Sequence, residues 1–300
     1  MHRRVVDQPV LAGVLGAIVI AFSAILVDLA DVSPVSAALW RCAYALPPLG
    51  VIAWFEHRKY GPRSRRERRL AAAAGLLFAV DIVVWHYAIE DVGAGLATVL
   101  GNLQVVIVPF VALAVLGEKV PKSILLALPP VCLGVVLVSG ALEEGAYGAN
   151  PARGALLGIA TGIAYAAFLL VQRQGSMDLR RPGGALFDMS IVATVASLAL
   201  GLAIGADDLA PSWPSAGWLI LLALTSQFLG WLLITLSLPR LPAAMTSMIL
   251  TIQPIGSVAL GAVLLSQEPS VLQLLGCAFI LSGLLTATVG GRARRRPHPA

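Results

Sequence analysis

Four ionisable side chains lie within long apolar runs of this sequence: Arg41, Asp81, His86 and Asp188. A charged group inside a bilayer costs about 2.5–3.5 kcal/mol on insertion scales, so each of the four is a candidate functional group. We expect Arg41 to bind an anionic group of a substrate or to take part in a gate. Two ion pairs are open to it, one with Asp81 and one with Asp188, and either would remove two uncompensated charges at once. A purely structural ion pair that fixes helix packing is the competing interpretation.

Asp81 and His86 are the candidate titrating groups. Asp81 lies near the middle of its apolar run, where a carboxylate is suited to proton coupling. His86 lies nearer the end of that run, between Trp85 and Tyr87, where the aromatic residues of a membrane interface are expected. We therefore expect His86 to pack at the interface.

Uncharged polar and aromatic side chains complete the candidate site. Gln253 precedes Pro254, and a proline inside a membrane helix frees a backbone carbonyl, so a broken helix with a nearby amide can contact a substrate. The alternative is a hydrogen bond between helices, worth about 0.6 kcal/mol. Aromatic rings can stack on a ligand, and the candidates are Trp40, Trp85, Tyr165 and Trp231. The predicted substrate-binding or gating residues are Arg41, Asp81, Trp85, Asn102, Gln104, Asp188, Gln227 and Gln253.

The elements that carry these residues are predicted to be membrane-spanning helices. The chain is 58% hydrophobic and only 12% charged, about half the charged fraction of a soluble domain. Helices are expected because lipid cannot satisfy free backbone groups, and the alternating pattern of a barrel is absent. Ten runs of about 20 residues are long enough to span a bilayer. They cover residues 10–29, 34–55, 70–89, 95–116, 123–141, 153–172, 184–205, 215–237, 242–265 and 270–290.

The distribution of basic residues predicts the orientation. With the N-terminus inside, 19 of the 21 Lys and Arg residues fall in the inner segments or termini. Arg153 falls outside, and Arg41 lies within a span. This positive-inside pattern predicts a multi-pass protein of the cytoplasmic membrane with both termini in the cytoplasm. It also explains the net charge of +5 without a nucleic-acid partner.

The second half of the chain echoes the first. The segment Ala38–Arg41 matches Ala185–Asp188 at an offset of 147, and Asp81–Trp85 matches Gln227–Trp231 at an offset of 146. We expect two five-helix units, residues 1–145 and 146–300. Because five is odd, the second unit begins on the opposite side of the membrane, which gives an inverted repeat. Repeats of this kind are a common build for secondary transporters that work by alternating access around a midplane site.

The sequence resembles the EamA branch of the drug/metabolite transporter superfamily over nearly its whole length. The resemblance lies in "ALWRCAYALP" of the second run, in "GNLQVVIVPFVALAVLGEKV" with its Gly117-Glu118 pair, and in "LTIQPIGSVALGAVLLSQEPS" of the second half. Pro254 stands 14 residues before Glu268 as the family pattern asks, whereas the first half has Gln104 there and the second has Gln267 in place of a glycine. The resemblance implies a secondary transporter of small metabolites such as amino acids, drugs or sugars, with export as the favoured direction.

Motifs for other activities are absent from the sequence. There is no P-loop, no HExxH and no G-x-S-x-G. The three cysteines lie in apolar runs without metal-binding or disulfide spacing, so we expect no metal and no cofactor. We expect a small-molecule substrate and the lipid bilayer as partners, with proton coupling through Asp81 as a hypothesis and the oligomeric state open. A lipid flippase is the main alternative function, and a membrane-embedded enzyme or a channel follows it.

Overall fold

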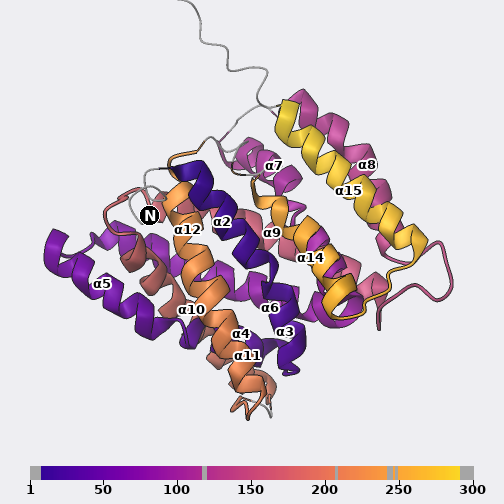
Figure 1. Ribbon diagram of the computed structural model, residues 1–300. Coiled ribbons are helices and arrows are strands. Elements are labelled where there is room, and N and C mark those ends of the chain that lie inside the picture. Colours follow the sequence, from indigo (N-terminus) through magenta and orange to yellow (C-terminus); the bar gives the residue numbers. More distant parts are fainter. Residues whose placement is uncertain (1–7, 117–119, 207–208, 242–245, 247–248, 291–300) are drawn as a thin grey trace, which may run out of the picture.

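The computed structural model describes residues 8–116, 120–206, 209–241, 246 and 249–290. Within these residues the chain is built of helices and contains no strand, as the sequence predicted (Figure 1). Six helical stretches are long and apolar enough to cross a bilayer. They are Pro9–Ala30, Pro34–Tyr60, Arg65–Gly101, Pro151–Gly175, Pro182–Ile204 and Ser215–Ser237. Five of them coincide with one predicted run each, whereas Arg65–Gly101 covers the run 70–89 and the first part of the run 95–116.

The other four predicted runs coincide with shorter or broken helices. They are the end of α6 together with α7 (Gln104–Leu116), α8 (Lys122–Val138), the region of α14 (Ile252–Leu264), and α15 (Val271–Gly290). The structure thus confirms the helical class in the part of the chain that it describes, and the number of ten spans stays a prediction. The Gly117-Glu118 pair and the terminal arginines lie outside the described residues.

The first two stretches each consist of two helices that meet at a break. α2 (Pro9–Ala21) and α3 (Ser23–Ala30) meet at Phe22. α4 (Pro34–Ala43) and α5 (Leu46–Tyr60) are separated by a turn just before two consecutive prolines in the first turn of α5. Proline has no backbone N–H, so it cannot continue the ladder of a preceding helix but fits well in a first turn. These breaks interrupt the helical hydrogen-bond ladder within each stretch.

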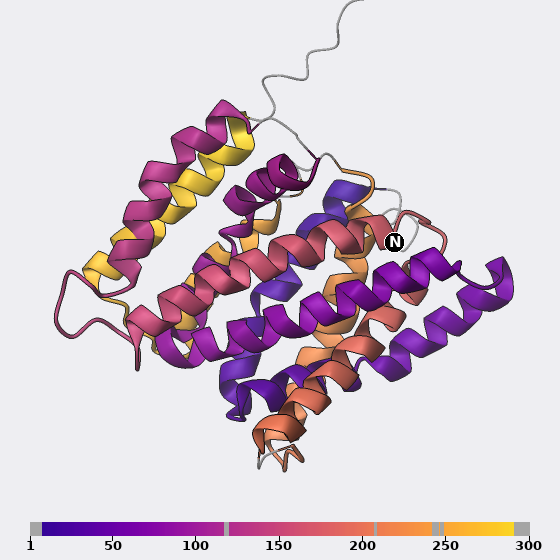
Figure 2. The ribbon, with the colours of Figure 1, turned by 180° about the vertical axis from the view of Figure 1, so that it is seen from behind.

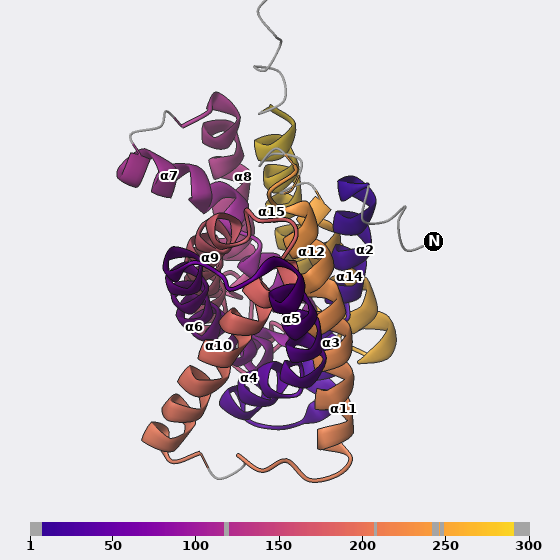
Figure 3. The same cartoon turned by 90° about the vertical axis from the view of Figure 1, so that its left-hand side faces the viewer.

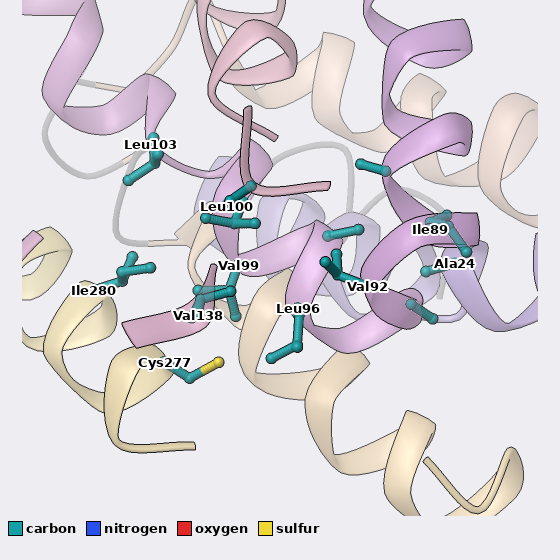
Figure 4. Close-up of a cluster of buried hydrophobic side chains, with 14 of the residues drawn as sticks. Ala24, Ile89, Val92, Leu96, Val99, Leu100, Leu103, Val138, Cys277 and Ile280 are labelled. Atoms are coloured by element: carbon teal, nitrogen blue, oxygen red, sulfur yellow. The ribbon is translucent and has the colours of Figure 1, made fainter. Parts of the chain in front are cut away.

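α6 (Arg65–Gly101) is the central element. Its start is a capping box, in which Ser64 Oγ accepts from the Glu67 N–H at 3.2 Å and Glu67 Oε2 accepts from the Ser64 N–H at 2.6 Å. Gly93 has φ 82° and ψ 164°, which divides α6 into two parts. This backbone region is open essentially to glycine alone. The part after Gly93 is buried on all sides within a cluster of apolar side chains, shown in Figure 4.

α9 (Pro151–Gly175) runs side by side with α6 across the molecule (Figure 2). Glycines permit this close approach: a Cβ at Gly158 would lie 2.4 Å from Leu100 Cβ, and one at Gly154 would lie 2.4 Å from Val92 Cγ1. Small residues at a helix interface allow backbones to approach in the same way in other membrane bundles.

The remaining helices belong to the second half and to one edge of the molecule. α10 (Pro182–Ile204) is followed by α11 (Ser215–Leu222), η1 (Ala223–Gly230) and α12 (Trp231–Ser237), which form one continuous stretch with a π-helical middle. α8 and α15 lie against each other at the edge of the molecule (Figures 1 and 3). Gly134 and Gly276 allow this contact, since a Cβ at either would lie 2.7 Å or less from the backbone oxygen of the other.

Contacts between the halves follow a two-fold pattern. α4 packs on α10, and α8 packs on α15, so the corresponding helices of the two halves meet. The contact of α6 with α9 has its counterpart in the contact of η1 and α12 with α2. Likewise, α7 packs on α9 as α14 packs on α2. Exchanging the two halves therefore maps these helix pairs onto one another.

Candidate functional site

A cavity of about 60 Å³ lies at the centre of the helical body and is lined by residues of both halves. The lining residues are Ile20, Ser23, Arg41, Phe78, Asp81, Ile82, Trp85, Thr98, Gly101, Asn102, Thr161, Tyr165, Trp231 and Gln253. They come from seven of the ten predicted spans. The cavity has room for a few water molecules, since one water needs about 10–15 Å³ on this measure.

Three helix breaks border the cavity. Ser23 starts α3 directly after the break at Phe22. Asn102 ends α6, and its side-chain amide donates to the Thr98 carbonyl at 3.0 Å. Gln253 lies in the first turn of α14. Helix breaks are tolerated in a membrane where the backbone is buried in protein or faces a polar cavity, and substrate sites of transporters are commonly built on them.

The cavity contains one cationic and one anionic side chain. Arg41, on the last turn of α4, is 1% exposed and lies 5.8 Å from the centre of the Phe78 ring. Asp81, on α6, is also buried. The two charges interact electrostatically, but neither forms an ion pair with any described residue. Of the alternatives that the sequence left open, the structure therefore brings Arg41 and Asp81 to one cavity without pairing them directly.

Unpartnered polar atoms concentrate at this cavity. Among the described residues, fourteen buried side-chain nitrogen and oxygen atoms have no hydrogen-bond partner, and seven of them belong to its lining. One atom each comes from Ser23, Asn102, Thr161, Trp231 and Gln253, and two come from Arg41. Each such atom costs about 1–3 kcal/mol, and buried polar groups are usually paired. A concentration of this kind is expected where a polar ligand or water binds.

An aromatic wall forms one side of the cavity. The Trp231 ring packs edge-on against Phe78 at 5.5 Å between centroids and against Tyr165 at 6.2 Å. Phe168 lies behind them, 4.9 Å from Phe78. Trp85, on the part of α6 before Gly93, also lines the cavity. A cavity with charged residues on its walls and aromatic rings along one side suits a ligand that has both charged and apolar parts.

Five of the eight predicted site residues line the cavity: Arg41, Asp81, Trp85, Asn102 and Gln253. Two of the other three are buried elsewhere. Gln104, at the start of α7, has an unpartnered Nε2 atom but does not line the cavity. Gln227, in η1, donates from Nε2 to Ser190 Oγ at 3.4 Å and so links η1 with α10.

Asp188 lies away from the cavity, so the structure does not contain the Arg41–Asp188 pair, one of the two alternatives that the sequence left open. The Asp188 carboxylate instead pairs with Arg63, at 2.5 Å between Nη1 and Oδ2. Asp188 is the seventh residue of α10 and lies near its first turns, beside the connection between α5 and α6. Equivalent positions of two oppositely oriented units lie on opposite sides of the midplane, so a match in sequence does not by itself bring Arg41 and Asp188 together.

A second charged cluster surrounds Asp188 at this end of the molecule. Arg63 also donates to the carbonyls of Gly184 and Gly175, at 3.0 and 3.2 Å. Glu56 Oε1 and Oε2 accept from the N–H groups of Gly183 and Gly184, at 2.9 and 2.6 Å, and so cap α10. These contacts join the α5–α6 connection of the first half to the α9–α10 connection of the second.

The turn between α9 and α10 has its own ion pairs. Asp178 accepts from Arg180 Nε at 2.9 Å and from Arg181 Nε at 2.8 Å. The hydrogen bond from the Arg180 side chain, with help from Arg181, holds the pKa of Asp178 below its usual range. The turn is thus held in one shape at neutral pH.

A further ion pair joins the halves beside the Gly93 kink of α6. Asp91 is 1% exposed, and its carboxylate accepts two hydrogen bonds from Arg153, at 2.7 and 2.6 Å. The Asp91 carbonyl also accepts from the Asn150 N–H at 3.2 Å. The sequence predicted Arg153 as the one basic residue on the outer side. Its pairing with the buried Asp91 carboxylate gives a physical reason for this exception.

His86 is buried within the protein, and its predicted position at the membrane interface stays a prediction. Its side chain is 1% exposed, and Nδ1 lies 3.0 Å from the Pro34 carbonyl. The start of α4 covers it, which the position of His86 near the end of its apolar run could not reveal. His86 lies outside the cavity lining.

Sequence reasoning overlooked the hydroxyl residues of the cavity. Ser23, Thr98 and Thr161 line it, and each stands inside an otherwise apolar run. Small hydroxyl residues are common in membrane helices, where they often bond to the preceding turn, as Thr98 does to the Ala94 carbonyl at 2.7 Å. Their presence in a span was the available signal, but it did not distinguish them from packing residues.

Metal chemistry has no visible support in the described part of the chain. No group of three or more His, Cys, Asp or Glu side chains is placed to hold a metal ion there. Cys42 and Cys277 are buried, Cys132 is exposed, and all three are free thiols.

Comparisons with known proteins agree with the repeat and the fold. The model of the EamA-like transporter family matches the chain twice, over residues 8–140 and 152–289. A solved structure described only as "Crystal structure of protein" matches with a TM-score of 0.65 at 14% sequence identity, covering 97% of this chain and 99% of that one. At this identity the match shows the fold alone. The search of curated proteins gave no match.

Proposed function

Because the chain belongs to the EamA-like transporter family, we propose that it carries a small solute across the membrane through the central cavity. The concentration of unpartnered polar atoms at one cavity between the halves is the observation that carries this proposal. Buried polar groups without partners are costly, and a solute that pairs with them recovers that cost when it binds.

We infer that the solute is a zwitterion of the amino acid type. Arg41 is suited to a carboxylate, because its guanidinium presents several donors in a fixed fork. Asp81 is suited to an ammonium group. The wall of Phe78, Tyr165 and Trp231 would hold an apolar side chain, and cationic groups are also attracted to such ring faces.

Transport would proceed by alternating access of two inverted five-helix units, with boundaries near residues 145 and 146. The two-fold pattern of helix contacts supports this arrangement. A cavity of about 60 Å³ is small for an amino acid, so the helices must separate to admit one. The Arg63–Asp188 cluster at one end and the Asp91–Arg153 pair at the other join the two halves, and we assign them as gates that open in turn.

The basic ends of the helices would face the cytoplasm, in keeping with the positive-inside pattern of a protein in the cytoplasmic membrane. Asp81 is the proposed proton-coupling group, because it is buried beside the proposed binding site and forms no ion pair with a described residue. Outward movement of the solute is the proposed direction.

Flux into proteoliposomes tests the proposal. Purified protein would be reconstituted, and the movement of amino acids, sugars and cationic drugs followed with and without an imposed pH gradient. We expect saturable movement of amino acids, absent from empty liposomes, that responds to the gradient. Movement of sugars or cations alone would contradict the zwitterion assignment. No solute movement together with scrambling of labelled lipid would replace the proposal with a flippase.

A further inference from the structure

A continuous surface groove runs from the lipid-facing side of α5 and α10 to the arginines at the start of α6. Three depressions make it up. The first, of about 860 Å³, is apolar and is lined by residues such as Leu46, Val51 and Phe55. It shares Gly50, Trp54 and Phe187 with the second. The second, of about 320 Å³, shares Arg68 with the third, which is otherwise lined by Arg65, Arg69 and Ala72.

We propose that this groove binds an anionic phospholipid, with an acyl chain along the apolar depression and the phosphate group at Arg68. The proposal goes beyond transport and does not depend on the identity of any solute. It requires only that the chain is embedded in a membrane, which family and composition both show.

The apolar part of the groove faces lipid. In α5 only Leu49 is buried, whereas Trp54 is 48% and Phe55 61% exposed. α5 packs mainly against α10, so the outer face of α5 has no protein cover among the described residues. Hydrocarbon is the natural contact for this face, and the groove gives an acyl chain a defined path beside Trp54.

The polar part of the groove offers an arginine outside the ion pairs, although Arg68 also attracts the nearby Asp188 carboxylate. The carboxylates there are already engaged, since Asp188 pairs with Arg63 and Glu56 accepts from the Gly183 and Gly184 N–H groups. Arg68 is exposed and has no ion pair with a described residue. An incoming phosphate therefore meets free cations and not free carboxylates.

The shape of the groove separates this proposal from a general effect of basic residues. A run of arginines beside a membrane helix orients the protein and attracts any anionic surface. That attraction would not distinguish Arg68 from Arg66, which belongs to the same first turns of α6 but lines none of the three depressions. A specific site would distinguish them, because only Arg68 joins the second and third depressions.

Quenching of tryptophan fluorescence by brominated lipids tests the site. Protein in phosphatidylcholine bilayers would be mixed with brominated phosphatidylglycerol or, separately, brominated phosphatidylcholine. The Trp54 signal is the difference between each protein and its Trp54→Phe derivative. We expect the wild type to prefer phosphatidylglycerol over phosphatidylcholine. In Arg68→Gln this preference should fall about fivefold, whereas the matched control Arg66→Gln should keep it.

Three results would overturn the proposal. The first is equal quenching by the two lipids in the wild type, and the second is an equal loss of preference in Arg68→Gln and Arg66→Gln. The third is displacement of the lipid by millimolar inorganic phosphate, which would make the groove a site for free phosphate. Both arginines are exposed, so neither substitution threatens folding.

Discussion

Replacing the two cavity charges together separates a binding role from a structural one. In the double variant Arg41→Met/Asp81→Asn, the fully buried arginine gives way to an apolar side chain of similar length, and Asp81 is not left as a lone charge. Two nitrogens of Arg41 have no partner in the wild-type cavity. Removing a buried, unpaired donor recovers about 1–3 kcal/mol per group, so the double variant should be as stable as the wild type or more stable.

The same variant should lose transport. Charge-assisted hydrogen bonds are each worth about 1.5–3 kcal/mol, so loss of the Arg41 contacts alone predicts a 10- to 100-fold weaker affinity for the solute. Thermal unfolding in detergent without solute and flux in proteoliposomes measure the two effects on one preparation. We expect the Tm to stay level or to rise by a few degrees while flux disappears.

The single variants complete the test. Arg41→Met leaves the Asp81 carboxylate without its nearby cation, and so it should be less stable than the double variant. A fall in Tm in the double variant, with flux retained, would refute a binding role. It would show instead that Arg41 and Asp81 hold the helices together.

Three further predictions concern the supports of the cavity. Gly93→Ala should lower the Tm, with a loss of stability of about 1–3 kcal/mol. The reason is that Gly93 has φ 82° and that a Cβ there would lie 2.9 Å from the Tyr147 ring. An unchanged Tm would contradict the kink. Arg63→Gln and Asp188→Asn should show a coupling of about 0.5–3 kcal/mol in a double-mutant cycle of Tm values, and strictly additive losses would contradict a gate contact. Asp178 has a lowered pKa in the folded protein, so its ion pairs stabilise the fold above its unfolded pKa and lose this effect as the pH falls through the folded value. Asp178→Asn should therefore lower the Tm at pH 7 and matter less in acid, and an equal loss at both pH values would count against it.

The sequence predicted the membrane class, the repeat and much of the cavity for identifiable reasons. Arg41 and Asp81 stand out because a charged side chain is costly in lipid, so few roles other than function or ion pairing explain its presence in a span. Asn102 and Gln253 stand out as amides in apolar runs, and both prove to lie at or next to helix breaks. Trp85 could have faced lipid as easily as the cavity, and only packing decides between those two.

The failures have equally specific causes. Asp188 matched Arg41 in the repeat, but equivalence in an inverted repeat does not bring two residues together unless both lie near the axis. The tie between Arg63 and Asp188 depends on how a loop of the first half meets a helix of the second, which local pattern does not encode. Gly93 gives the same signal as many membrane glycines, so the kink in α6 was invisible before the structure.

Solute exchange is the most direct test of the central claim that the cavity between the halves carries the transported solute. Proteoliposomes loaded with one unlabelled amino acid at a time would be diluted into a trace of the same labelled amino acid, with the wild type and the Arg41→Met/Asp81→Asn variant compared at equal, folded amounts. We predict rapid saturable exchange for the wild type with at least one amino acid and none above empty liposomes for the variant. Equal exchange by the two proteins would place the transport path elsewhere and contradict the claim.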